Sequence, residues 1–161
     1  MIPRSSRERM IVVAALCAGL TGGKLSAATE MQQRSSKDDR EIRAVMSAQA
    51  AAWNRGDIDG FMNGYARSDA TEFIAGDRLT LGWQTVRDRY KKKYDSREKM
   101  GTLTFSELKI MLLSRDAALV IGRWRLLRKK DKPHGRFTLL FRRLPDGWRI
   151  AHDHTSAAEP R

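Results

Sequence analysis

The chain has one cysteine, few acidic residues and no long apolar run beyond its N-terminus. A single cysteine excludes an internal disulfide, so the folded part must be stabilised by its core. No segment after the N-terminal run is apolar enough to span a bilayer, which takes about 20 residues. Asp and Glu number 19 against 31 Lys and Arg, and the formal net charge is +12. We therefore expect a soluble protein whose surroundings or ligands are anionic.

The first 28 residues have the pattern of a secretory signal peptide. Three early arginines precede an apolar run over residues 11–20, and Ser26, Ala27 and Ala28 offer small residues for cleavage. Cleavage near Ala27 or Ala28 removes the cysteine, four basic residues and one acidic residue. The remaining 27 Lys and Arg against 18 Asp and Glu lower the net charge from +12 to +9. We expect the mature chain to be exported, to the periplasm or the extracellular space.

The remaining chain is long enough for one compact domain. Residues 29–37 are polar and predict a loose linker, residues 38–156 form the folded domain, and residues 157–161 form a tail. The first helix is expected over residues 38–53, where apolar side chains recur every three or four positions. Asp38, with an acidic residue three positions later, resembles an N-terminal capping box.

Two further helices and a hairpin are predicted before the main sheet. Asp57 suits the N-cap of a short second helix. The apolar spacing of residues 83–94 predicts a third helix. Between these helices, residues 71–74 and 79–81 flank a Gly-containing turn, which predicts a hairpin.

The C-terminal half alternates in the manner of β-strands. Residues 102–113, 118–126 and 137–141 predict strands joined by short turns, and residues 147–156 predict the last strand. A phase slip near residues 106–107 indicates a β-bulge. The pattern predicts an α+β fold in which a curved antiparallel sheet wraps around the N-terminal helices. A cavity between such layers suits a small ligand.

The last predicted strand holds two of the three histidines. Alternate side chains of an extended strand share a face, which here groups Trp148, Ile150, His152 and His154. Asp153 has the opposite parity, so a regular strand would point it away from that face, although a bulge would reverse this. We therefore expect the strand to run from the core into a polar pocket that contains the two imidazoles.

Several short motifs occur in the order that is typical of one family. They are Trp53-Asn54-Arg55-Gly56-Asp57, Gly82-Trp83, Tyr90, Gly122-Arg123-Trp124, Phe137-Thr138-Leu139 and Gly147-Trp148-Arg149-Ile150. Over nearly all of residues 38–156 the chain resembles SnoaL-like domains of the nuclear transport factor 2-like superfamily. The resemblance implies a cystatin-like cone of the ketosteroid-isomerase type. It leaves the function open, because the superfamily includes isomerases, cyclases, dehydratases, ligand carriers and assembly domains.

Two observations concern assembly. The C-terminal end is similar to the association domain of calcium/calmodulin-dependent kinase II, an oligomerisation module. The similarity lies at alternate positions of residues 148–156, which are tryptophan, isoleucine, histidine, histidine and serine. The superfamily resemblance implies a homodimer formed across the open face of the sheet. Apolar and basic side chains on that predicted outward face are Leu119, Ile121, Arg123, Arg125 and Arg149.

The candidate site residues are aromatic side chains and the two histidines. Those expected to line the cone and contact a ligand are Trp53, Tyr65, Tyr90, Trp124, Phe137, His152 and His154. Packing in the core is the alternative role for each aromatic residue. Imidazoles transfer protons near neutral pH, so His152 and His154 are the candidate catalytic residues. A zinc site needs a third ligand that the sequence does not indicate, and we expect no metal and no cofactor.

Three functions stay open. The first is an exported domain that binds a small organic molecule, anionic or neutral, in its cone. The second is a pocket enzyme of the isomerase, cyclase or dehydratase type. The third is a non-catalytic oligomerisation module. The basic charge also suits nucleic acid, but basic and aromatic residues are not interleaved and the chain carries an export signal, so we expect no nucleic-acid partner.

Overall fold

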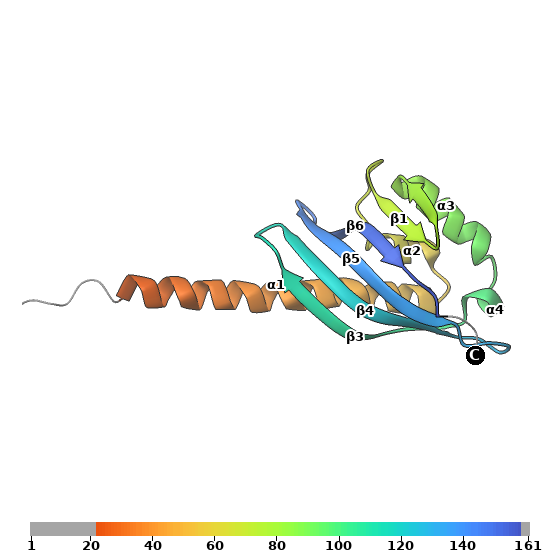
Figure 1. Cartoon of the computed structure of the whole chain (residues 1–161), viewed down its shortest axis with the longest axis horizontal. Helices are drawn as coiled ribbons and strands as arrows, with labels where there is room; N and C mark the ends of the chain where they lie inside the picture. Colours follow the sequence, from red (N-terminus) through yellow and green to blue (C-terminus); the bar gives the residue numbers. More distant parts are fainter. Residues whose placement is uncertain (1–21, 159–161) are drawn as a thin grey trace, which may run out of the picture. The chain divides into compact units, whose positions relative to one another are not determined.

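The computed structural model describes residues 22–158 (Figure 1). The chain divides into two compact units, residues 1–34 and 35–161. The described residues of the first unit are helical, and the second unit holds the α+β domain. Residues 1–21 of the predicted signal peptide lie outside the described residues. No helix in the described part of the chain is long and apolar enough to cross a membrane.

Helix α1 spans Gly22–Asn54 and begins well before the predicted start. Residues 29–37 are helical, so the prediction of a loose linker there is wrong. This stretch contains no proline or glycine and includes the helix formers Glu, Met, Gln, Arg and Lys, which let the helix extend upstream. Asp38 is therefore inside the helix and not at its cap. Its buried carboxylate forms an ion pair with Arg143 from the sheet.

The buried stripe of α1 follows the predicted spacing. Ile42, Met46 and Trp53 are almost fully buried, and Gln49 is buried among them. The helix ends at Asn54, and the next turn places Gly56 at a φ of 88°, a conformation that favours glycine. The predicted first helix is confirmed from residue 38 onward.

Three shorter helices follow. Helix α2 spans Ile58–Met62, and its predicted N-cap, Asp57, accepts a hydrogen bond of 2.6 Å from the amide of Gly60. Helix α3 spans Trp83–Lys93, as the apolar spacing predicts. The sequence pattern gave no indication of helix α4, Arg97–Met100, because a single turn is too short to show a helical period.

Six strands form one sheet in the order β2-β1-β6-β5-β4-β3. The bounds of the strands are β1 Glu72–Ala75, β2 Arg78–Leu81, β3 Thr102–Leu112, β4 Ala117–Leu127, β5 His134–Leu144 and β6 Gly147–Thr155. All neighbouring pairs are antiparallel except β1 and β6, which are parallel. The sheet is therefore mixed, whereas the sequence predicts a purely antiparallel one. Local turns reveal antiparallel neighbours, but the parallel pair joins segments that are far apart in sequence, with Glu72 opposite His152.

The predicted bulge in β3 is confirmed. Its register with β4 shifts between Ser106 and Lys109, and Glu107 has a φ of 54°. The bulge moves the buried positions of β3 to the other parity. Leu103 and Phe105 lie on the core side before the shift, and Leu108 packs against the core after it.

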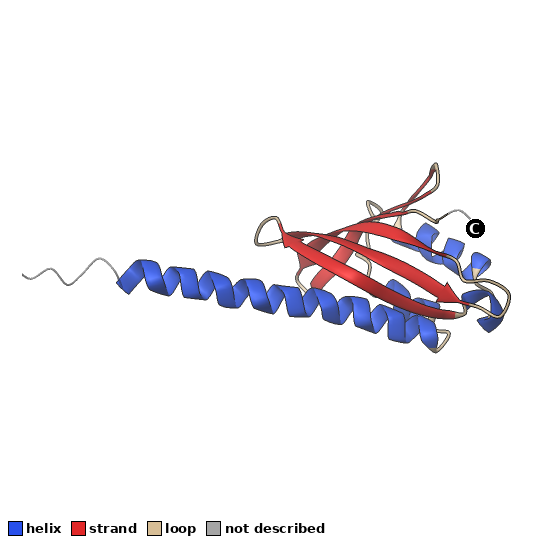
Figure 2. Cartoon of the chain, turned by 60° about the horizontal axis from the view of Figure 1, so that its bottom comes forward, coloured by secondary structure: helices blue, strands red, loops and turns tan. Residues whose placement is uncertain are grey.

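The sheet curves over the helices on one side (Figure 2). Side chains of β5 and β6 form much of the inner layer, including the buried Phe137, Leu139, Phe141, Trp148 and Ile150. Burial of this layer supplies the main stabilisation of a domain that has no cysteine among its described residues. The predicted α+β class and the curved sheet around the helices are confirmed, apart from the parallel pair.

Candidate functional site

A cavity of about 360 Å³ lies between the concave face of the sheet and the helices. Residues from α1, α2, α3, β1 and β3 to β6 line it, together with the backbone that follows β6. Most of the lining side chains are aromatic or aliphatic. A concave, mainly apolar cavity with a few polar groups is the usual form of a small-molecule site.

The five predicted aromatic residues all line this cavity. They are Trp53, Tyr65, Tyr90, Trp124 and Phe137. Further rings extend the wall, with Phe61 at a centroid distance of 5.2 Å from Trp53 and Tyr94 at 4.6 Å from it. The indole of Trp53 donates a hydrogen bond to the carbonyl of Met100, and the indole of Trp124 donates to that of Ser156. Their polar edges are therefore satisfied by backbone, and the ring faces are free to form an apolar wall.

The two histidines do not line the cavity. The register of β6 with β5 shifts at Ala151: His152 pairs with Leu140, whereas Ile150 pairs with the next residue, Phe141. This bulge reverses the alternation, so that Ile150 and Asp153 face inward. The prediction that His152 and His154 share the inner face of Trp148 and Ile150 is wrong.

On the outer side, His152 pairs with a carboxylate of the neighbouring strand. Its Nδ1 lies 2.6 Å from Oε2 of Glu72, which is its register partner on β1. His154 is exposed. Glu72 is therefore outside the cavity as well.

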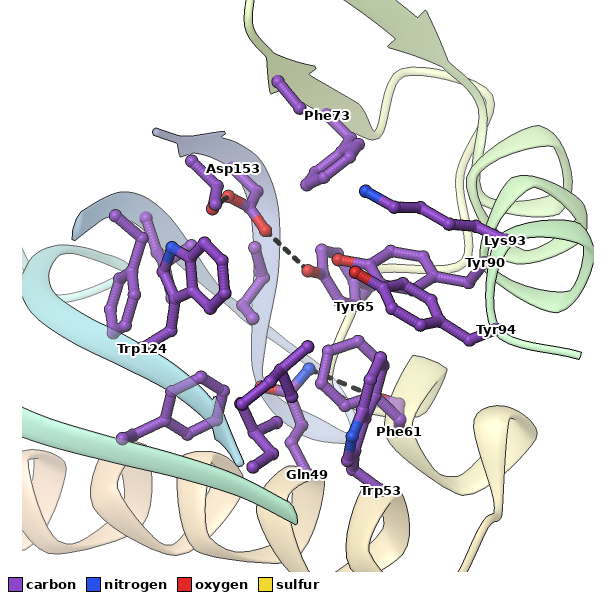
Figure 3. A pocket seen from close by; sticks show the side chains of 18 of the residues that line it. Gln49, Trp53, Phe61, Tyr65, Phe73, Tyr90, Lys93, Tyr94, Trp124 and Asp153 are labelled. Carbon is purple, nitrogen blue, oxygen red and sulfur yellow. Dashed lines mark hydrogen bonds between the residues drawn. The ribbon is translucent and has the colours of Figure 1, made fainter. Parts of the chain in front are cut away.

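Asp153 is a cavity-lining residue that the regular-strand pattern missed. The residue is 4% exposed, and its carboxylate accepts hydrogen bonds of 2.6 Å from the hydroxyls of Tyr65 and Thr155 (Figure 3). Burial raises the pKa of Asp153 to about 6, although these bonds and the two nearby imidazoles favour the charged form. The sequence carried one indication of this switch. The even positions of the strand are apolar at Trp148 and Ile150 but become polar at His152 and His154.

Two tyrosine hydroxyls lie close to this carboxyl group (Figure 3). Burial and the negative charge of Asp153 raise the pKa of both Tyr65 and Tyr90 well above the usual value. Burial likewise raises the pKa of Tyr94, whose ring stacks on Tyr90 at 5.9 Å. The phenols therefore stay protonated at neutral pH and act as hydrogen-bond donors.

Other polar groups in the lining are an amide and two cations. Gln49 is buried, and its Nε2 donates to the carbonyl of Phe61 at 3.0 Å. Arg89 and Lys93 reach the cavity from α3. Within residues 22–158, no three His, Cys, Asp or Glu side chains gather in a way that could hold a metal ion.

A curved sheet that encloses a cavity against helices defines a cone-shaped α+β domain. A sequence profile of the SnoaL-like domain matches residues 42–160, and the chain belongs to this family. A search of curated proteins finds no match.

Solved structures support the same assignment. An NTF-2 like protein of unknown function from Shewanella oneidensis is 40% identical, with a TM-score of 0.71, and the match covers 73% of this chain and 98% of that one. A cystatin-like domain of unknown function from Nostoc punctiforme is 19% identical, with a TM-score of 0.65 and coverage of 77% and 79%. A ketosteroid isomerase-like protein from Erwinia carotovora is 21% identical, with a TM-score of 0.60 and coverage of 75% and 96%. The last two show the fold alone, so the function must be argued from the site.

Proposed function

We propose that this SnoaL-like domain binds a small organic molecule in its cone. The observation that carries the proposal is an aromatic cavity of about 360 Å³ that contains a buried carboxyl group, Asp153. Ligand pockets commonly span about 300–1,000 Å³, so this cavity suits a ligand at the small end of that range. The rings of Trp53, Phe61 and Tyr94 favour a planar apolar body, whereas Asp153 and Tyr65 favour a polar group on it.

Binding can be tested with N-phenyl-1-naphthylamine, a neutral probe that fluoresces in apolar sites. Ala75 lies on β1 and lines the cavity, so Ala75→Trp would fill space that the probe needs. Ala70→Trp adds the same ring at an exposed position outside the cavity. We expect saturable binding to the wild type and to Ala70→Trp, and at least tenfold weaker binding to Ala75→Trp. Equal binding to all three proteins would place the probe elsewhere and count against the proposal.

A second candidate function is proton transfer to or from the bound molecule. The pKa of about 6 for Asp153 favours it, because a carboxyl group near neutrality can both accept and release a proton. Tyr65 donates to the same carboxylate and would stabilise the charged form. In this proposal Asp153 takes the role predicted for His152 and His154, since neither imidazole lines the cavity. An isomerase, cyclase or dehydratase could use such a group.

The proton-transfer function can be tested by incubating a panel of small carbon acids with the protein in D₂O. Wild-type protein should catalyse deuterium incorporation into at least one of them, measured by NMR. Asp153→Asn removes the titratable group and should abolish the exchange, while His152→Ala/His154→Ala should retain it. If only the histidine variant lost exchange, the imidazoles and not Asp153 would be the proton-transfer groups.

We further propose that the chain is exported after cleavage near Ala27 or Ala28. The support is the basic, apolar and small-residue pattern of residues 1–28. Mass spectrometry of protein purified from the export compartment should find an N-terminus at residue 28 or 29. A retained Met1 would refute this proposal.

We propose that the outer face of the sheet is a homodimer interface. The alternative is an assembly module that forms a larger oligomer and binds no ligand. Leu119 pairs across the strands with Leu140, and both are half-buried on the face opposite the cavity. Light scattering at several concentrations should give the mass of two chains, and Leu119→Arg should give the mass of one. A larger discrete oligomer with no probe binding would favour the assembly module.

A further inference from the structure

We propose that Arg89 and Lys93 form an anion subsite, and that the ligand of the cone is an organic acid. Such a ligand has a ring-containing apolar body and one carboxylate or similar oxyanion. The inference rests on the proposed ligand-binding function and adds the chemical class of the ligand. Both cations line the cavity and belong to helix α3.

The two cations share one face of the helix. Residues four positions apart are neighbours on a helical surface, so Arg89 and Lys93 lie next to each other. Like charges at this spacing destabilise a helix by a few tenths of a kcal/mol. A bound anion would relieve this repulsion.

Two other cations of α3, Arg87 and Lys91, are paired with a carboxylate, whereas the two that line the cavity are not. Arg87 lies 2.5 Å and Lys91 3.0 Å from the carboxylate of Asp59. In the described part of the chain, neither Arg89 nor Lys93 forms an ion pair with a carboxylate. Arg87 and Lys91 are therefore paired away from the cavity, while the two cations toward it have no carboxylate partner among the described residues.

The polar contacts of Arg89 leave most of its guanidinium free. One nitrogen, Nη1, donates to the hydroxyl of Thr80 at 2.7 Å, and the group stacks over Phe73 at 4.9 Å. These contacts orient the fork while its other N–H groups stay available for an oxyanion, which Arg binds in bidentate fashion.

Lys93 extends into the cavity from α3, between Phe73 and the tyrosines (Figure 3). Its Nζ lies 5.3 Å from the ring centroid of Tyr94. Partial burial, together with the charges of Arg89 and Arg128, lowers the pKa of Lys93. A bound anion would act in the opposite direction, because a negative charge nearby favours the ammonium form and raises its pKa.

The position of Asp153 is compatible with an anionic ligand. Among the described residues that line the cavity, Asp153 is the one carboxylate, and its two oxygens accept bonds from Tyr65 and Thr155. It lies on β6, on the other side of the cavity from α3 (Figure 3). The anionic end of the ligand would lie at α3, and a neutral polar group would face Asp153.

Two probes that differ by one charged group test the inference. 8-Anilino-1-naphthalenesulfonate and N-phenyl-1-naphthylamine share their rings, and only the former carries a sulfonate. The full-length protein, Lys93→Met and Arg89→Met/Lys93→Met are titrated with both. The readout is the ratio of the two dissociation constants, which cancels general damage to the cavity. Lys92→Met, with the same charge change at an exposed position outside the cavity, is the matched control.

We expect the double variant to weaken sulfonate binding at least twentyfold, and Lys93→Met at least fivefold, with neutral-probe binding unchanged within twofold. Lys92→Met should change neither. Arg89→Lys/Lys93→Arg, which keeps both charges, should restore the wild-type ratio. An unchanged ratio in the double variant, or a charge-preserving variant that behaves like the neutral one, would overturn the anion subsite and leave the proposed function intact. If neither probe binds the wild type, the proposed function fails and the inference fails with it.

Discussion

The hydroxyl of Tyr65 donates a hydrogen bond of 2.6 Å to the buried carboxylate of Asp153. The two residues are far apart in sequence and meet because an isolated bridge pairs Tyr65 with Ile150, close to the bulge in β6. The bond places a neutral donor on a carboxyl group whose pKa burial raises to about 6. In the proposed proton-transfer function, this pair sets the protonation state of Asp153.

Tyr65→Phe should raise the pKa of Asp153 further. The change removes a hydrogen bond that favours the charged carboxylate and adds no compensating group. A bond to a charged group contributes about 1.5–3 kcal/mol, and 1.36 kcal/mol corresponds to one pKa unit, so we expect a rise of roughly one to two units. A ¹³C NMR titration of the aspartate side chains measures it. Thr155→Val should act in the same direction, and a lowered pKa in either variant would contradict the assignment.

Asp153 should make the domain less stable as the pH rises from about 4 to about 6. The pKa of the folded state is raised from 3.8 to about 6, so in this window the folded protein holds a proton that the unfolded chain has released. Stability is then lost with increasing pH, by up to about 3 kcal/mol for two pKa units. Urea denaturation at pH 4 and pH 7.5 should show that Asp153→Asn gains stability relative to the wild type at the higher pH.

The control for this measurement is Asp77→Asn, in the exposed turn between β1 and β2. It should follow the pH dependence of the wild type. If the free energy of unfolding changed with pH in the same way for the wild type and Asp153→Asn, Asp153 would have an ordinary pKa in the folded protein.

The sequence was sufficient to predict features that show as a repeat between residues close together in the chain. The stripe of Ile42 and Met46 and the phase slip at Glu107 were both visible as spacing, and both are present in the structure. It was insufficient at Ala151, because a bulge inserts one residue and reverses every later side chain without any necessary change in composition. That single residue decides whether histidines or Asp153 enter the cone.

Contacts between residues far apart in the sequence could not be predicted from residue spacing either. The aromatic lining was predicted as a set, since buried rings are recognisable by type, and the five residues do line one cavity. The parallel pairing of β1 with β6, and with it the contact of Glu72 with His152, depends on how the hairpin packs on the finished sheet. Local patterns carry no information on such a contact.

His152→Ala/His154→Ala should leave probe binding in the cone unchanged within twofold. His152 is half-buried against Glu72 outside the cavity and His154 is exposed, so neither substitution alters the wall. A partly exposed side-chain pair of this kind contributes up to about 1 kcal/mol, and the loss of stability should not exceed that figure. Titration with N-phenyl-1-naphthylamine and urea denaturation at pH 7 check the two statements. A tenfold loss of binding at unchanged stability would show that the imidazoles reach the ligand.

Asn54→Ala should destabilise the domain by about 1–3 kcal/mol, since two hydrogen bonds are lost at about 0.5–1.5 kcal/mol each. The side chain of Asn54 joins the end of α1 to β3, with Nδ2 donating to the carbonyl of Leu103 at 3.0 Å and Oδ1 accepting from its amide at 2.7 Å. This bridge gives a physical role to the asparagine of the turn that follows the first helix. Asn63→Ala, which removes an exposed amide that accepts a bond from Arg67, should cost less than about 0.5 kcal/mol. Urea denaturation at pH 7 compares the two, and equal losses would show that the bridge to β3 adds no stability beyond that of a surface contact.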